Sequence, residues 1–260
     1  MVYKRVIYSL LYSKGFFHLS RNFRLQQVGD VDWLKNNFGF GETCDYIDEL
    51  MITLVTKNPD KNEINNYFKD VKKLKENIFV PIILGGGIRT FDQAKYCFLN
   101  GADKILINQL AHEKNETINK VAKVYGEQAV TLMVDYKKID DINYSFSNSA
   151  EKKSMNLKNY FKNIKNLNFG EIIINSIEKD GTAQGLNLDC LEDLTNNFNK
   201  PVLLMGGAGK PDHFVTPLKK NEVSGIVTAN LFNFLGDGLK KARSFSIDNG
   251  VRLIEFQRIH

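Results

Sequence analysis

Two glycine pairs are the residues whose type and spacing point most directly to chemistry. The first pair lies in VPIILGGGIRTFD (residues 80–92), and the second lies in KPVLLMGGAGKPD (residues 200–212), at an offset of 120 residues. Glycine lets a backbone turn sharply and present its N–H groups to a ligand, and a following helix N-terminus favours an anion. Because the pairs occupy equivalent places in two similar segments, we predict two related phosphate sites.

The end of the next expected strand would complete each phosphate site. Two related sites on one face suit a ligand with a phosphate at each end, or two phosphorylated ligands. The alternative for each glycine pair is that it only permits a tight turn. The residues that the repeat predicts for the two sites are Gly86, Gly87, Asn108 and Gln109 in the first half, and Gly206, Gly207, Ala229 and Asn230 in the second.

Two aspartates could transfer protons. Asp135 ends the fifth expected strand, and Asp180 follows the sixth, directly before Gly181. In a barrel the chemistry sits at the C-terminal ends of the strands, where two acids can act as general acid and base. Asp180 could instead cap a turn, as Asp before Gly often does. By the internal symmetry the counterpart of Asp135 is Leu11, which cannot transfer a proton.

Histidine and cysteine give no sign of a metal or covalent site. The chain has 4 His and 3 Cys without metal-ligand spacing, and no Ser or Cys stands in a nucleophile-elbow sequence. We therefore expect no metal, no cofactor, and reduced thiols in a cytoplasmic protein. The net charge of +5 is too small to predict a nucleic acid partner, although it suits a phosphorylated small molecule. No apolar run reaches the roughly 18–20 residues that span a bilayer, so we expect no membrane partner.

Regularly alternating elements must position these residues. Eight runs rich in Val, Ile and Leu are separated by amphipathic stretches, which is typical of a parallel sheet covered by helices. Eight such units predict a (β/α)8 TIM barrel, and an open doubly wound sheet is the alternative from the pattern alone. The expected strands are Lys4–Tyr12, Glu49–Thr56, Val80–Leu84, Asp103–Asn108, Ala129–Asp135, Glu171–Ile177, Pro201–Met205 and Gly225–Ala229. The expected helices are Glu63–Ile78, Phe91–Asn100, Asn115–Tyr125, Asn156–Leu167, Leu188–Phe198, Asp212–Lys220 and Gly238–Asn249.

The internal repeat favours the closed barrel. Similar segments recur at similar offsets in both parts of the chain, which a barrel accommodates as two homologous (β/α)4 halves. We predict a single barrel domain over residues 1–260, with halves at about 1–125 and 126–260. The polar stretch Asp140–Ser154 is predicted to be a long loop on the active face.

Four segments of the sequence resemble HisF, the cyclase subunit of imidazole glycerol phosphate synthase. They are GGGIRT (85–90), GADKILIN (101–108), DGTAQG (180–185) and GGAGKPDHF (206–214), and the similarity runs over almost the whole chain. The resemblance implies a (β/α)8 barrel that forms a heterodimer with a HisH-like glutaminase docked on its N-terminal face. It also implies that ammonia crosses the barrel to a substrate with two phosphates at the opposite face.

The resemblance also assigns roles to residues by position. The family's phosphate contacts add Gly181 and Asp180 to the residues that the repeat predicts. The family's ring of charges at the ammonia entrance falls on Arg5, Glu49, Lys104 and Glu171, and all four charges are retained.

The departures from the family fall on proton-transfer groups. The two catalytic aspartates of the family fall on Asp135 and Leu11, so that Asp135 and Asp180 remain as the candidate catalytic residues. The family's first-loop lysine falls on Leu19, and an acid at the end of the second strand falls on Leu54. Losing one member of an acid–base pair lowers a rate by about 10²–10⁴. Thr and Ser residues that line the barrel are replaced by Ile83, Leu106 and Met205.

This pattern is similar to that of the second HisF-like proteins of bacterial surface-polysaccharide clusters, the WbuZ type, whose first strand also has Leu in place of Asp. In that group the glutaminase and the barrel supply ammonia to a separate ATP-dependent amidotransferase that converts an acetamido sugar to an acetamidino sugar. The first hypothesis is therefore ammonia delivery for sugar amidination. The second is a divergent cyclase of histidine biosynthesis in which Asp135 and Asp180 share the proton transfers. The third is a ligand-binding barrel without a channel.

Overall fold

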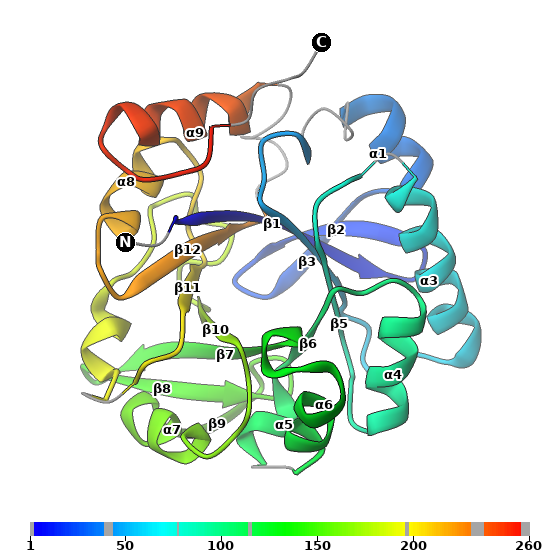
Figure 1. The fold of residues 1–260 in the computed structure, drawn as a ribbon, viewed down its shortest axis with the longest axis horizontal. Coiled ribbons are helices and arrows are strands. Elements are labelled where there is room, and N and C mark those ends of the chain that lie inside the picture. Colours follow the sequence, from blue (N-terminus) through cyan, green and yellow to red (C-terminus); the bar gives the residue numbers. More distant parts are fainter. Residues whose placement is uncertain are drawn as a thin grey trace.

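The strands form a closed parallel barrel (Figure 1). The computed structural model describes residues 3–38, 44–76, 78–113, 116–195, 198–229 and 237–255. Within them the order around the barrel is β10-β11-β12-β1-β4-β5-β6-β7, and the pairing of β7 with β10 closes the ring. The barrel strands are β1 (Arg5–Ser13), β4 (Glu49–Leu54), β5 (Ile82–Gly85), β6 (Lys104–Ile107), β7 (Val130–Ile139), β10 (Glu171–Ser176), β11 (Val202–Met205) and β12 (Val223–Thr228). The prediction of a (β/α)8 barrel is confirmed, and the open sheet is excluded.

Helices surround the barrel on its outer side (Figure 1). They are α1 (Val31–Phe38), α3 (Lys61–Lys75), α4 (Phe91–Leu99), α5 (Gln109–His112), α6 (Thr117–Tyr125), α7 (Leu157–Ile164), α8 (Asp212–Leu218) and α9 (Gly238–Asp248), with 3-10 turns η1 (Glu127–Ala129) and η2 (Asp189–Asp193). Local sequence starts several of them: Thr90 and Gln93 form a capping box at α4, and the Asp60 side chain accepts the Glu63 N–H at α3.

The helix predicted over Leu188–Phe198 is wrong. The described part of this segment forms only the 3-10 turn η2. Asp, Asn and Thr dominate the segment after Leu191, and their side chains compete for backbone hydrogen bonds, which disfavours a helix interior.

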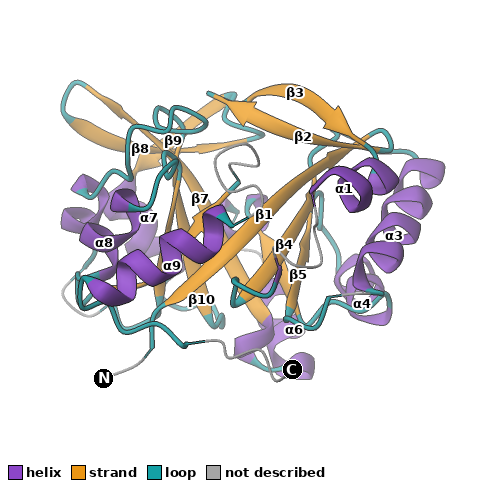
Figure 2. Cartoon of the chain, turned by 90° about the horizontal axis from the view of Figure 1, so that it is seen from above, coloured by secondary structure: helices purple, strands orange, loops and turns teal. Residues whose placement is uncertain are grey.

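Two antiparallel hairpins extend from one end of the barrel (Figure 2). One is β2 (Phe16–Arg21) with β3 (Arg24–Gly29), and the other is β8 (Ile142–Ser147) with β9 (Lys152–Asn156). The second hairpin corrects the prediction of a loop at Asp140–Ser154. Asp140 and Asp141 both have positive φ, which makes the tight two-residue turn that lets β8 fold back onto β7. The segment reads as polar because much of the hairpin is exposed.

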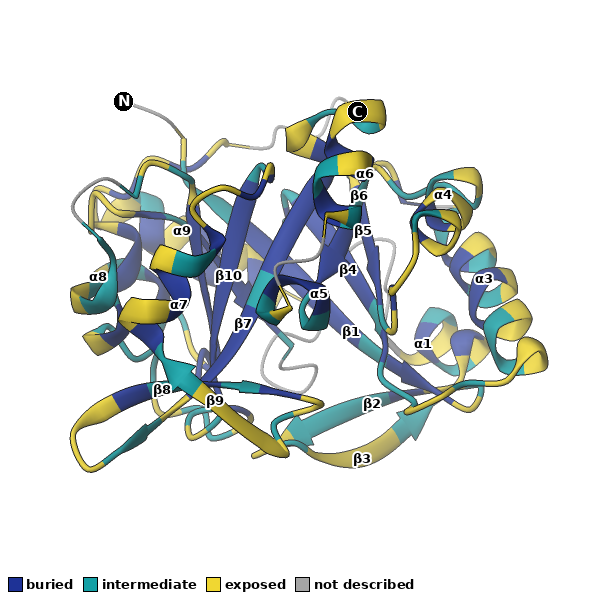
Figure 3. Cartoon of the chain, turned by 90° about the horizontal axis from the view of Figure 1, so that it is seen from below, coloured by how far each residue is buried: buried dark blue, intermediate teal, exposed yellow. Residues whose placement is uncertain are grey.

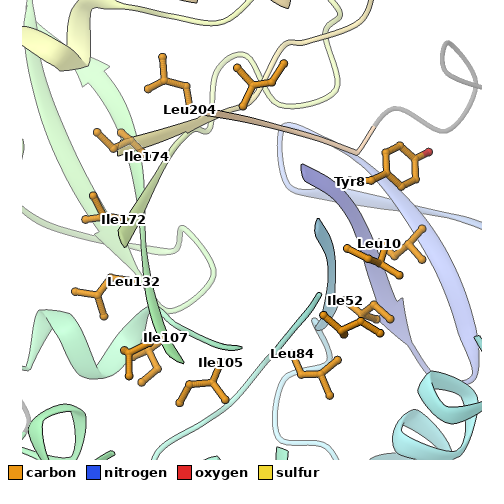
Figure 4. Packing of buried hydrophobic residues seen from close by; sticks show 14 of the residues in the cluster. Tyr8, Leu10, Ile52, Leu84, Ile105, Ile107, Leu132, Ile172, Ile174 and Leu204 are labelled. Atoms are coloured by element: carbon orange, nitrogen blue, oxygen red, sulfur yellow. The ribbon is translucent and has the colours of Figure 1, made fainter. Parts of the chain in front are cut away.

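The barrel strands are buried on both faces (Figure 3). Outward side chains, such as Tyr8, Leu84 and Ile172, point toward the helices and form the larger core (Figure 4). Inward side chains form a second apolar group, which we call the inner cluster; its members are Ile7, Met51, Ile83, Leu106, Ile173, Leu203, Met205 and Val227. The alternation of side chains along each strand separates the two groups.

Candidate functional site

A ring of four charged side chains lies at the N-terminal end of the barrel. Arg5, Glu49, Lys104 and Glu171 are the first residues of β1, β4, β6 and β10, so their side chains meet at the same level. Arg5 contacts Glu49, and it also lies 2.6 Å from Glu171. Lys104 lies 2.8 Å from Glu49 and 2.9 Å from Glu171, which closes the ring. The structure therefore brings together all four residues that the family resemblance indicates.

The charges in this ring balance each other. Glu49 and Glu171 are buried, and the Thr131 hydroxyl adds a hydrogen bond to Glu171 at 2.9 Å. Burial opposes ionisation of Glu171, but Arg5 and Lys104 outweigh it, so the pKa of Glu171 is lowered. Each of the two carboxylates contacts both cations of the ring.

The inner cluster separates this charged ring from the C-terminal end of the barrel. Ile83, Leu106 and Met205, the residues that replace hydroxyl side chains of the family, all belong to it. Each of these three side chains is buried. The interior above the charged ring is therefore apolar and closely packed.

Asp135 is the buried carboxylate at the C-terminal end of the barrel. The Asn175 side-chain amide donates to one of its oxygens at 2.7 Å, and the Asn108 amide donates to the other at 2.7 Å. Burial, with a smaller contribution from the charge of Asp180, raises the pKa of Asp135 to about 6, against the two amide donors. A carboxyl group that titrates near neutrality can both accept and return a proton.

Leu11 leaves Asp135 without an acidic partner from β1. Leu11 shares a strand face with Arg5 and Ile7, which both face the barrel interior, and it stands in register with Thr53 of β4. Leu54 differs, because it packs in the outer core beneath the helices. At the position that the resemblance matches to a second catalytic acid, this chain thus presents an apolar side chain.

Asp180 ties the β2–β3 hairpin to the loop after β10. Its carboxylate accepts hydrogen bonds from the Ser20 hydroxyl and, at 3.0 Å, from the Phe23 N–H, and its carbonyl accepts the Asn22 N–H. These contacts join Asp180 to the hairpin, and among the described residues its carboxylate makes no hydrogen bond to its own turn, so the capping alternative stays a prediction. A proton-transfer role for Asp180 stays a prediction.

The second predicted phosphate site surrounds a cavity of about 230 Å³. The cavity is lined by Leu19, Ser20, Asp180, Gly181, Ala183, Met205, Gly206, Gly207, Ala208, Val227, Thr228 and Ala229. Gly207 has φ +102°, and a Cβ there would lie 2.2 Å from the Gly185 carbonyl oxygen, so only glycine fits this turn. Asn230 lies outside the described residues. The structure thus gathers the described residues of the second site, together with Leu19 in place of the family's lysine.

In the first predicted phosphate site, the polar side chains contact other protein groups. Gly87 has φ +66°, and a Cβ added there would meet no described protein atom within 4 Å, so its outer side is open. Asn108 instead turns its amide to Asp135, and the Gln109 side chain accepts the Asn148 N–H of the second hairpin at 3.0 Å. A role for Gly86, Asn108 and Gln109 in binding phosphate stays a prediction.

The sequence analysis missed Asn175. A polar residue in the run EIIINS was a usable signal, because alternation places it on the same face as Glu171 and Ile173. The register that places it beside Asp135 was not available from one sequence.

Comparison with known proteins defines the class of the chain. A family model described as histidine biosynthesis protein matches residues 45–236. The chain therefore belongs to this family of barrel proteins.

Similar proteins narrow the class to HisF. A protein of Parasynechococcus marenigrum (strain WH8102), provisionally named imidazole glycerol phosphate synthase subunit hisF2, is 39% identical over 92% of this chain and 89% of its own length. The imidazole glycerol phosphate synthase subunit HisF of Hydrogenobaculum sp. (strain Y04AAS1) is 29% identical over 97% and 99%, and that of Chlorobium limicola (strain DSM 245 / NBRC 103803 / 6330) is 28% identical over 96% and 98%. The chain is a HisF-like subunit of the imidazole glycerol phosphate synthase family. No described helix is long and apolar enough to cross a membrane.

Proposed function

We propose that this chain delivers ammonia from a HisH-like glutaminase, through the barrel, to an acceptor other than the substrate of the histidine-pathway cyclase. The observation that carries the proposal is the closed charged ring at one end of a barrel whose other end has Leu11 opposite Asp135. The entrance features of the family are retained, while one of its two catalytic acids is replaced by a side chain that cannot exchange protons.

The apolar interior supports transfer of neutral ammonia. An ion that leaves water for an apolar interior loses its hydration, which costs several kcal/mol even after relaxation. Ammonia without charge avoids this penalty, and the apolar side chains of the inner cluster disfavour the ammonium ion. The close packing means that side chains such as Met51, which is flexible, must move as ammonia passes.

Exposed apolar side chains support a partner at the N-terminal face. Phe79 precedes β5 and is 96% exposed, and Leu99 and Val124 lie in the last turns of α4 and α6, at the same end of the barrel. Large apolar side chains gathered at one end are typical of a protein interface. A HisH-like glutaminase that docks over the charged ring would cover them.

We propose acetamido-sugar amidination, for surface glycan synthesis, as the reaction that uses the ammonia. In this scheme a separate ATP-dependent amidotransferase carries out the acyl activation, so the barrel needs no acid–base pair of its own. The first-strand sequence KRVIYSLLYSKG, with Leu11, supports the likeness to WbuZ-type proteins. The cavity at Gly207 and Ala229 would bind a phosphate group of a small-molecule ligand.

A divergent cyclase is the second candidate, and Asp135 favours it. Its pKa of about 6 keeps a proton donor and acceptor at the place where the family carries out cyclisation. Here Asp135 would work with Asp180, which raises its pKa through charge.

Replacing Lys104 tests the delivery role. In a reconstituted mixture of the chain, a HisH-like glutaminase and the sugar amidotransferase, product is measured with glutamine and, separately, with ammonium chloride. We expect Lys104→Met to lower the ratio of glutamine-driven to ammonium-driven product at least about tenfold, because Glu49 and Glu171 lose one of the two cations that they share and keep only Arg5. Lys200→Met, which removes an exposed pair with Glu127, is the matched control. An unchanged ratio in the Lys104 variant contradicts the proposal.

A further inference from the structure

Asn175 is a buried amide that the proposed function does not use. It lies on β10 in direct register with Asp135 of β7, and it is 3% exposed. Three isoleucines, Ile172 to Ile174, precede it on the strand and Ser176 follows it, so the apolar run of β10 ends at this amide.

The amide of Asn175 is committed to Asp135. Its Nδ2 donates to one carboxylate oxygen at 2.7 Å, while Asn108 donates to the other from the opposite neighbouring strand. Only the NH₂ group of the amide can face a carboxylate, which fixes the orientation of the Asn175 side chain. Two donors from β10 and β6, on either side of β7, hold the plane of the carboxylate in one orientation.

The other end of the Asn175 amide is left unsatisfied. Its Oδ1 is buried and has no hydrogen-bond partner among the described residues, and it lies beside Gly206, where a Cβ would be 3.3 Å away. A buried acceptor without a partner destabilises a fold. An isoleucine or valine would avoid this penalty, so the contact with Asp135 is what the amide contributes.

Burial disfavours the ionised form of Asp135, and the two amide donors oppose this effect. Burial raises its pKa to about 6, and the hydrogen bonds from Asn175 and Asn108 act in the opposite direction. Among the described groups, Asp180, in the loop after β10, raises this pKa through its charge, and the Tyr160 hydroxyl of α7 is close enough for Asp135 to raise the pKa of that hydroxyl. Asn175 is therefore one of two groups that offset the effects of burial and of Asp180.

We propose that Asn175 is a positioning residue, which holds Asp135 in one orientation and keeps its carboxylate ionised at neutral pH so that it can accept a proton. A reaction that uses this proton belongs to the second candidate function, the divergent cyclase, but the effect of Asn175 on Asp135 rests on neither candidate. The orientation of Asp135 depends on these amides more than that of an acid with a second acid opposite it would, because the Leu11 side chain cannot exchange a proton with it.

The titration of Asp135 tests this role on the chain alone. The ¹³C signal of its carboxyl carbon is followed by NMR from pH 4 to pH 9 in protein labelled at aspartate, and Asp135→Asn assigns the signal. We expect Asn175→Leu, which keeps the number and branching of the side-chain heavy atoms and removes the donor, to raise the titration midpoint by about 1–2 pH units. Thr53→Val is the matched control, because it removes a buried hydroxyl without a described partner and should leave the midpoint unchanged. A midpoint equal to that of the wild type in Asn175→Leu overturns the proposal.

A second variant keeps the test decisive if Asn175→Leu does not fold. Asn175→Asp preserves the shape and places a second carboxyl group against Asp135, so the two should titrate in two steps, with the upper step above the wild-type midpoint. A single step at the wild-type midpoint overturns the proposal. Neither the glutaminase nor an acceptor is present in these titrations, so failure of the Lys104 coupling experiment would leave this result interpretable.

Discussion

At the scale of single residues, the C-terminal end of this barrel is built around one buried acid. Asp135 receives two amide hydrogen bonds, and its β1 counterpart is Leu11. Asp180, the other predicted acid, fastens the first hairpin through Ser20 and Phe23. We therefore propose that Asp135 is the principal proton-transferring group of the site.

The raised pKa of Asp135 predicts a pH-dependent effect of replacing it. The carboxyl group titrates at about 6 in the folded chain against 3.8 as its ordinary value, so its burial destabilises the fold above pH 6 and has no such effect below pH 3.8. Relative to the wild type, Asp135→Asn should gain about 3 kcal/mol of unfolding free energy between pH 4 and pH 7. Urea unfolding of both proteins across this range measures the gain, and a difference that does not vary with pH would contradict it.

Which residues form the site could be read only partly from the sequence. The first residues of four strands converge because parallel strands begin at one end of a barrel. The family resemblance therefore placed Arg5 and Glu171 in one charged ring from the sequence alone. Asn175 could not, since its role depends on the register between β7 and β10. Register is set by long-range packing, which one sequence does not display.

At the scale of elements, the tight turn after β5 depends on one glycine of its pair. Gly86 has φ +111°, and a Cβ there would lie 2.0 Å from the Leu54 carbonyl oxygen, whereas Gly87 has open space around it. We expect Gly86→Ala to lower the free energy of unfolding by more than about 2 kcal/mol, because backbone atoms must move. Gly87→Ala, the matched control, should lower it by only about 1 kcal/mol. Equal losses in urea unfolding would show that this turn is not built as described.

The barrel elements were predictable and the hairpins were not. Strands buried on both faces read as continuous apolar runs, which marks them clearly in a sequence. The β8–β9 hairpin is exposed over much of its length, so its residues resemble a loop, and only the paired Asp140 and Asp141 signal the turn. For the segment after Leu188 the error was the opposite one, because a helix was predicted and only a 3-10 turn forms. Its apolar residues have helical spacing, but the residues between them do not favour a helix.

At the scale of the whole molecule, the two ends of the barrel differ in character. Both hairpins lie at one end (Figures 2 and 3), where the cavity beside Gly207 is also found. The charged ring and the exposed Phe79 lie at the other end. The apolar inner cluster lies between them. This polarity suits a protein that takes up a small neutral molecule at one face and releases it at the other.

The exposed apolar group at the N-terminal face predicts where the glutaminase binds. Phe79→Ser should weaken the affinity of the chain for a HisH-like glutaminase at least about tenfold, because buried aromatic side chains dominate such interfaces. Leu25→Ser, at a 45% exposed site on the hairpin of the opposite end, should leave the affinity unchanged. Isothermal titration calorimetry measures both, and a larger effect of the Leu25 variant would place the partner at the other face.

We propose that the barrel no longer catalyses cyclisation but still delivers ammonia. The most direct measurement is turnover of the bisphosphate substrate of imidazole glycerol phosphate synthase with ammonium chloride as the nitrogen source, so that no glutaminase is needed. We expect the turnover of this chain to be at least about 100-fold below that of the Hydrogenobaculum HisF assayed in parallel, because Leu11 replaces an acid of the catalytic pair. Turnover within about tenfold of that relative would contradict the account and identify the chain as a working cyclase.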